Sequence, residues 1–252
     1  MNGFTALLGK EFREILRTWR IWVLPGFLIF NALSGPASAK LSRELMSSVL
    51  GPDAAKGMPA PTFWDSWSQW TKNLSPTILL VILVSMAGLV CGEVAQGTAV
   101  LVLTKPVSRT AFVLAKFTAA MVFVAAATAL GTMVTWGLTE VLFDGVQAVP
   151  LWRATALWLA VAACCLAVAL LASSALPSTL GAAGAGLASL IVISLLGLWG
   201  PLARNSVVGL PGLAVRAGAG DPVQVLWPVA SAVVVTALLL ALAVRVLGRR
   251  EI

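Results

Sequence analysis

The residues of this chain that could carry chemistry are few, and their types exclude most catalytic and metal sites. The sequence has no histidine, which removes the commonest metal ligand and the usual base of a nucleophilic site. Its cysteines fall in or at the ends of apolar segments, where thiols simply pack: Cys91, Cys164 and Cys165. No Gly-x-x-x-x-Gly-Lys-Ser/Thr loop is present. We therefore predict no catalytic residue, no metal site and no cofactor in this chain, so energy for any active process must come from another protein.

Charged and apolar residues interleave in one stretch, from Glu93 to Lys116, between two long segments without charge. Those segments, 73–92 and 117–139, are each about long enough to cross the ~30 Å hydrocarbon core of a bilayer. The stretch is therefore predicted to be a short loop between two membrane helices. Its three cations mark it as cytoplasmic by the positive-inside rule: Lys105, Arg109 and Lys116.

Individual residues in this stretch predict a bent, partly helical elbow. The pair Gly97-Thr98 is expected to interrupt a helix, and Lys105 is pushed out of the helical conformation because the ring of Pro106 crowds it. Ser108 can accept hydrogen bonds from the free N–H groups of the next helix, which is then expected to begin near Arg109.

The elements that position this elbow are membrane helices. At 252 residues, 59% hydrophobic and 11% charged, the chain lies far from soluble domains, which carry about 25% charged residues. We expect an all-α integral membrane protein forming a single transmembrane domain over residues 1–252. Six spans are predicted, at about 21–39, 74–91, 112–138, 154–172, 179–199 and 225–244.

Six spans place both termini on one side, and the charge distribution favours the cytoplasm for that side. The predicted cytoplasmic segments hold ten cations and four acids, and the external ones seven cations and six acids, a net +6 against +1. The protein is thus expected in the plasma (inner) membrane as a multi-pass protein. This clustering at span ends also argues against nucleic acid as a partner.

The first 19 residues are predicted to form an amphipathic helix along the cytoplasmic membrane surface. Apolar residues recur at spacings of three and four: Phe4, Leu7, Leu8, Phe12, Ile15, Leu16 and Trp19. The remaining positions carry the charges: Lys10, Glu11, Arg13, Glu14 and Arg17. A plain surface anchor is one interpretation of this helix, and a docking helix is the other.

Two external loops are expected, at 40–73 and 200–224, the second partly re-entering the membrane surface. Within the first, Trp64, Trp67 and Trp70 form a one-sided indole stripe. We interpret it as an interfacial belt, because indole is apolar with one polar N–H. The alternative is a surface for substrate access or for docking of a partner.

Polar residues inside the spans are uncharged, so an ion-coupling site of the chain's own is not expected. Thr128, Thr132 and Thr135 share one helix face, which favours interhelical hydrogen bonding; lining a translocation path between two protomers is the alternative. A further hypothesis pairs Glu93 with Arg109 as an ion pair that braces the elbow.

The order Glu93, Gly97, Thr98, Pro106, Arg109 and Lys116 between the second and third spans resembles the first cytoplasmic loop of ABC-2 type ABC transporter permeases. In that family the loop is a coupling helix that docks on a separate ATPase, here placed at 92–111. The run Gly-Lys-Glu-Phe-Arg-Glu-Ile-Leu-Arg-Thr also resembles the family's N-terminal connecting helix. The resemblance implies that the ATPase-coupling residues are Lys10, Glu11, Phe12, Arg13, Glu93, Gly97, Thr98, Lys105, Pro106 and Arg109.

The same resemblance implies a non-catalytic permease subunit that moves an amphipathic or lipid-like substrate, by export. Its partners would be two copies of an ABC ATPase that binds ATP and magnesium, a second permease protomer (identical or a paralogue) and the lipid bilayer. The alternative function is force transmission to an external partner protein without transport. An intramembrane enzyme is disfavoured, since no paired carboxylates, Ser-base pair or metal ligands lie within reach of the bilayer.

Overall fold

The structure, a computed structural model, describes residues 3–51, 59–98 and 108–249, and within these ranges it contains helices and turns but no strand. Six helical segments are long and apolar enough to cross a membrane, which confirms the predicted all-α protein with six spans. They are α2 (Arg20–Lys40), the segment through α4, α5 and α6 (Phe63–Ala95), α8 (Arg109–Leu142), α9 (Ala148–Ala175), α10 (Thr179–Leu196) and α13 (Leu226–Arg249).

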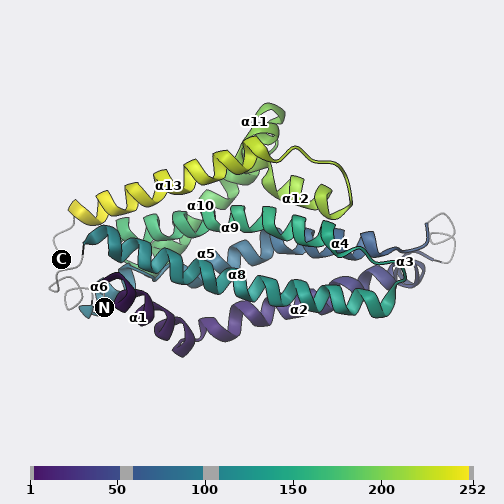
Figure 1. The fold of residues 1–252 in the computed structure, drawn as a ribbon, viewed down its shortest axis with the longest axis horizontal. Coiled ribbons are helices and arrows are strands. Elements are labelled where there is room, and N and C mark those ends of the chain that lie inside the picture. The colour runs from purple at the N-terminus through teal and green to yellow at the C-terminus, as the bar shows by residue number, and fades with distance from the viewer. Residues whose placement is uncertain (1–2, 52–58, 99–107, 250–252) are drawn as a thin grey trace.

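The helices form one elongated bundle (Figure 1). Helix α1 (Gly3–Arg17), α6 (Cys91–Ala95), the start of α8 and the end of α13 gather at one end, which we call the elbow end. Helix α3 (Ser42–Leu50) lies at the opposite end. Helix α8 has 34 residues, about 50 Å at 1.5 Å per residue, so it is longer than the ~30 Å bilayer core and its charged first turns project beyond the apolar part.

Local chemistry sets where several helices begin. Ser108 accepts a hydrogen bond from the Ala111 N–H (3.1 Å) directly before α8, which confirms the predicted start at Arg109. Ser178 caps α10 in the same way through the Gly181 N–H (3.1 Å).

The second span begins earlier than predicted. Helix α4 (Phe63–Asn73) starts at a capping box in which the Thr62 N–H donates to the Asp65 carboxylate (2.8 Å). A π-helical turn (Leu74–Ile78) then joins it to α5 (Leu79–Met86). Only Ser75 departs from helical geometry there (φ −121°, ψ 119°), as the crowding ring of the following proline favours.

The indole stripe lies inside the protein, so the interfacial-belt interpretation is wrong for two of its three members. Helix α4 packs against α2, α9 and α12 (Leu210–Gly218), and Trp67 and Trp70 are both 0% exposed. Their N–H groups donate to the Gln147 carbonyl (3.1 Å) and the Thr155 hydroxyl (3.4 Å). Buried indoles need such acceptors, and periodicity alone does not reveal them.

The threonine face on α8 also points inward. Thr128, Thr132 and Thr135 are fully buried, and the Thr132 and Thr155 hydroxyls lie 3.2 Å apart, linking α8 to α9. Interhelical hydrogen bonding is therefore confirmed at Thr132. Lining of a path between protomers by these residues is wrong, because none reaches the outer surface of the chain.

The segment predicted as an external loop at 200–224 is largely helical. It contains α11 (Gly200–Asn205), a 3₁₀ turn (Val207–Gly209) and α12. Leu210, Ala214 and Ala217 are buried where α12 packs on α9 and α4. The chain thus folds back into the bundle here.

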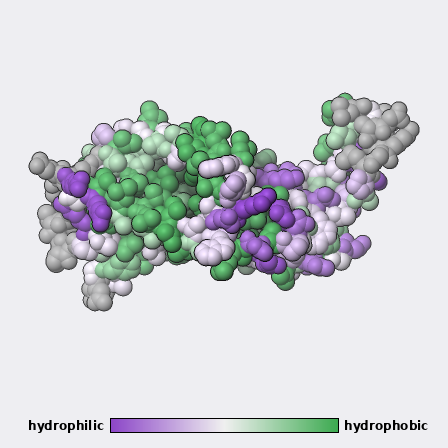
Figure 2. Space-filling view, turned by 90° about the horizontal axis from the view of Figure 1, so that it is seen from above, coloured by the Kyte–Doolittle hydropathy of each residue, from purple (hydrophilic) through white to green (hydrophobic). Residues whose placement is uncertain are grey.

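The outer surface has a broad hydrophobic region between hydrophilic areas toward the two ends (Figure 2). Helices α10 and α13 contribute much of the exposed apolar surface. In each of them, only 17% of the most apolar stretch of 18 residues is buried inside the protein. Examples are Leu180, Ile191, Leu195, Val233 and Leu238. Surface of this extent and composition fits contact with lipid or other membrane helices.

Replacing Gly131 by alanine is expected to destabilise the bundle by about 1–3 kcal/mol, because overpacking strains a close-packed core. A Cβ at this position would lie 2.7 Å from the buried Trp70 ring. The matched control is Gly137→Ala on the same helix, where a Cβ meets nothing within 4 Å. Thermal unfolding in detergent measures both, and equal melting temperatures for the two variants would show that the Trp70 contact is not restrictive.

Candidate functional site

Helix α1 turns a mixed face toward the bundle. Leu7, Glu11 and Ile15, spaced four residues apart on one side of the helix, are its buried residues, with Glu11 2% exposed. This face packs on α8. Glu11, predicted among the charged positions of an amphipathic helix, is therefore buried, and its carboxylate has a charged partner inside the protein.

That partner is Lys116 of α8, whose side chain is 0% exposed. Its Nζ donates to both oxygens of Glu11 (3.0 Å each) and lies 2.9 Å from Oε1 of Glu93 on α6. The ammonium also lies 4.9 Å from the centroid of the Phe112 ring. One buried cation thus joins α1, α6 and α8.

Lys10 completes the arrangement from the outer side. Its Nζ contacts Glu11 and Glu14 (3.1 Å each) and Glu93. Burial alone would lower the pKa of Lys10, but its hydrogen bond to Glu93 and the charges of Glu11 and Glu93 outweigh burial and raise that pKa above its ordinary value. Lys10 therefore stays charged at any physiological pH.

We call Lys10, Glu11, Glu14, Glu93 and Lys116 the charge cluster. Oxygens of its three glutamates lie within 4.8 Å of one another, a grouping that could hold a metal ion. Two lysine ammoniums already contact these carboxylates. The residues present thus form a salt-bridge network, in which a metal would have to displace lysine.

The break between α5 and α6, at residues 87–90, is held from three sides. The Ser173 hydroxyl on α9 accepts from the N–H groups of Val90 (2.9 Å) and Cys91 (3.0 Å). Arg20 of α2 donates to the Ser85 carbonyl (2.9 Å). A Cβ on Gly88 would lie 3.4 Å from Thr179 of α10. The chain entering the elbow is therefore fixed to three spans.

The predicted Glu93–Arg109 ion pair is wrong. Glu93 pairs with Lys10 and Lys116, whereas Arg109 donates to the backbone carbonyl of Leu247 (2.6 Å). A guanidinium at the end of a helix is well placed to bond one of its last carbonyls. Arg109 thus joins the first turn of α8 to the last span.

The other predicted coupling residues divide into three groups. Gly97 adopts a left-handed φ of +71° just after α6, and the Thr98 hydroxyl donates to the Glu93 carbonyl (3.2 Å), so a helix does end where predicted. On α1, Phe12 is half-buried and Arg13 exposed. Lys105 and Pro106, with most of the predicted coupling helix, lie outside the described residues.

Sequence reasoning did not assign Glu14, Arg20 and Ser173 to this site. Lys10 and Glu14 carry an available signal, since opposite charges four residues apart share a helix face. Nothing in the sequence marks Ser173, which acts through the tertiary contact of α9 with the elbow.

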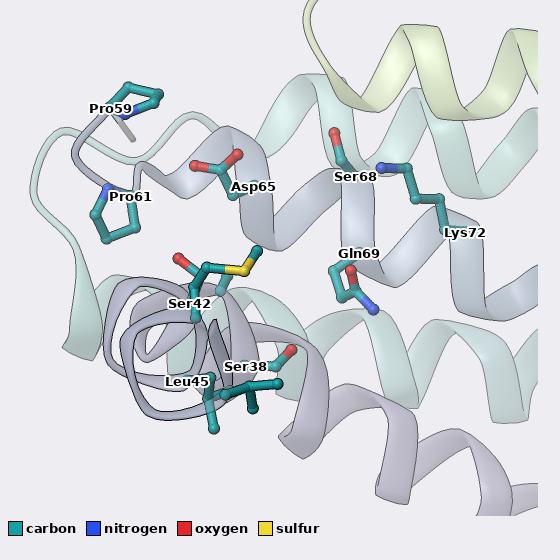
Figure 3. A pocket seen from close by; sticks show the side chains of 12 residues that line it. Ser38, Ser42, Leu45, Pro59, Pro61, Asp65, Ser68, Gln69 and Lys72 are labelled. Atoms are coloured by element: carbon teal, nitrogen blue, oxygen red, sulfur yellow. The ribbon is translucent and has the colours of Figure 1, made fainter. Parts of the chain in front are cut away.

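A cavity of about 520 Å³ opens near the opposite end, between the end of α2, α3 and α4. Figure 3 shows the polar side of α4 facing it, including Asp65, Gln69 and Lys72. The α3 side is apolar, with Leu45 and Val49. None of the three stripe indoles lines this cavity, and Trp67 and Trp70 are buried, so the alternative interpretation of the stripe as an access or docking surface is wrong for these two residues.

Comparison with known families gives one match. Residues 5–215 match the family model described as "ABC-2 family transporter protein". This range covers α1, the elbow and every span except α13. A search among curated proteins gave no significant match.

Replacing Lys116 by methionine is expected to destabilise the fold by about 3–5 kcal/mol, because the buried carboxylates of Glu11 and Glu93 lose their buried cation and keep only the partly exposed Lys10 beside them. Thermal unfolding of the purified chain measures the loss. The control is Arg17→Met at the exposed end of α1, expected to change stability by less than about 0.5 kcal/mol.

A double variant, Glu11→Gln with Lys116→Met, should lose less stability than the two single variants together, because the pair is directly coupled. Strict additivity would mean that the buried contact between α1 and α8 does not operate in the folded protein.

Proposed function

The chain belongs to the ABC-2 family of transporter proteins, and from that premise we propose that it is a permease subunit driven by a separate ABC ATPase through α1 and the elbow. In this proposal the chain itself is not catalytic. Two ATPase copies bind ATP and magnesium, and a second permease protomer, identical or a paralogue, completes the transporter in the plasma (inner) membrane.

The charge cluster is the observation that carries this proposal. It joins α1, the chain entering the elbow and the first turns of α8 by salt bridges whose carboxylates and central ammonium are buried. A push on α1 or on the elbow would therefore move α8 as well, because separating them would leave buried charges unpaired. Such a connected unit can receive motion outside the bilayer and pass it to a span.

The orientation in this proposal follows the charge distribution, with both termini and the elbow end in the cytoplasm. There α1 exposes Arg13 and Arg17, which form the docking surface together with the predicted coupling helix at 92–111. ATP-driven closure of the ATPases would rock the spans and export an amphipathic or lipid-like substrate.

A second function is favoured by the cavity bordered by α3 and α4. Lys72 lines this cavity and has no hydrogen bond or ion pair with any other described residue. A cation that has no such partner among the described residues and lies beside an apolar wall is suited to holding a partner protein outside the membrane. In this alternative the ATPase-driven motion is transmitted to that partner without transport.

The docking proposal is tested by reversing exposed charge on α1. Arg13→Glu with Arg17→Glu should lower retention of the ABC ATPase encoded beside this gene at least about tenfold in a pull-down, since close charge pairs at interfaces carry several kcal/mol. The matched control, Arg153→Glu with Arg204→Glu, reverses two exposed cations in segments predicted to be external, and should retain the ATPase as the wild type does.

Size-exclusion profiles and melting temperatures are compared with those of the wild type to establish that both double variants are folded. Equal retention by the two variants would contradict docking through α1. Failure of the wild type to retain the ATPase would contradict the permease proposal as a whole. Transport of an amphiphile by the reconstituted complex would support the permease function. ATP hydrolysis without movement of the amphiphile would instead support force transmission.

A further inference from the structure

A second cavity, of about 330 Å³, lies beside the π-helical turn (Leu74–Ile78) of the second span, and its rim includes the exposed Leu198. Ser75 and Leu79 line it from the second span, Val161 and Cys165 from α9, and Ser194 from α10. The 3₁₀ turn and α12 contribute further lining. It is separate from both the charge cluster and the cavity of Figure 3, which involve other residues.

None of the described residues that line this cavity is Asp, Glu, Lys or Arg. Its walls are mainly the aliphatic side chains of Leu79, Val161, Leu190, Ile193 and Leu198. A charged group placed here would lose its hydration without gaining an opposite charge, which costs several kcal/mol. The cavity therefore discriminates against charged ligands.

One residue that lines the cavity has a polar group without a partner. The Ser75 hydroxyl is buried and has no hydrogen bond with any described residue, and it lies where the backbone leaves helical geometry. The hydroxyls of Ser189 and Ser194 on α10, by contrast, donate to carbonyls of their own helix. A buried hydroxyl without a partner is destabilising, and a ligand that supplies the missing hydrogen bond removes this penalty.

We propose that this cavity binds an uncharged amphiphile, with its apolar chain against the aliphatic walls and one hydrogen-bonding head group at Ser75. The inference rests on the proposed function and specifies it, since it names the substrate class as neutral amphiphiles. Carboxylate or ammonium amphiphiles of the same chain length are excluded.

The test uses the purified chain in detergent and three photoreactive probes with the same diazirine-bearing twelve-carbon chain. They end in an alcohol, a carboxylate or a trimethylammonium group. After irradiation, mass spectrometry compares labelling of cavity residues with labelling near Val234 on α13, which is 57% exposed. The ratio of cavity to α13 labelling corrects for unequal partitioning of the probes into the micelle.

The alcohol should give a cavity-to-α13 ratio at least about tenfold above the two charged probes, corresponding to 1.4 kcal/mol or more. Ser194→Trp, which fills the cavity from its rim, should lower the alcohol ratio to that of the charged probes. The matched control is Val192→Trp, at an exposed position of α10 that does not line the cavity, and it should leave the ratio unchanged.

Ser75→Ala should weaken cavity labelling by the alcohol about three- to tenfold, because it removes one hydrogen bond. A fourth probe, with the same chain and a plain hydrocarbon end, should label the cavity of this variant as it labels the wild type. Equal ratios for all three head groups would overturn the proposal, as would equal effects of the two tryptophan variants. No ATPase is present in the labelling experiment. A negative labelling result therefore contradicts the cavity proposal without contradicting ATPase docking, and a failed pull-down contradicts ATPase docking without changing the expected labelling.

Discussion

The arrangement of the elbow end depends on one constraint, the buried ammonium of Lys116. A cation removed from water must be surrounded by carboxylates, and here they come from two other helices, Glu11 on α1 and Glu93 on α6. These partners fix how α1 lies on the bundle and where the second span ends. Lys10 then balances the added negative charge.

The remaining contacts at this end serve the same geometry through hydrogen bonds between side chains and the backbone. Ser173 satisfies two backbone donors at the break before α6, and Arg109 satisfies a carbonyl at the end of α13. Together with the charge cluster and the hydrogen bond from Arg20 to the Ser85 carbonyl, they connect α2, the second span, α8, α9 and α13. At α10, the Thr179 hydroxyl lies 3.7 Å from the Cys91 thiol. Force applied at the elbow would thus spread over the whole bundle, as the proposed function requires.

Sequence reasoning succeeded where a signal is local. Charge-free length located the six spans, and Ser108 marked a helix start because a cap acts within three residues. It failed where partners are distant in the chain: Glu11 finds Lys116 105 residues away, and Trp67 finds Gln147 80 residues away. An indole or a glutamate on a helix face looks alike whether it meets solvent or the core. The coupling helix itself lies mostly outside the described residues and stays a prediction.

The distance in sequence between Glu11 and Lys116 also bears on how the protein is made. Ribosomes add about 5–20 residues per second, so α1 exists for about 5–20 seconds before its buried partner has been synthesised. During that interval Glu11 must remain hydrated. Helix α1 cannot pack in its final position on α8 until the third span has begun to emerge. Docking of the first helix therefore has to wait for the second span and the elbow, but it can precede synthesis of the last three spans.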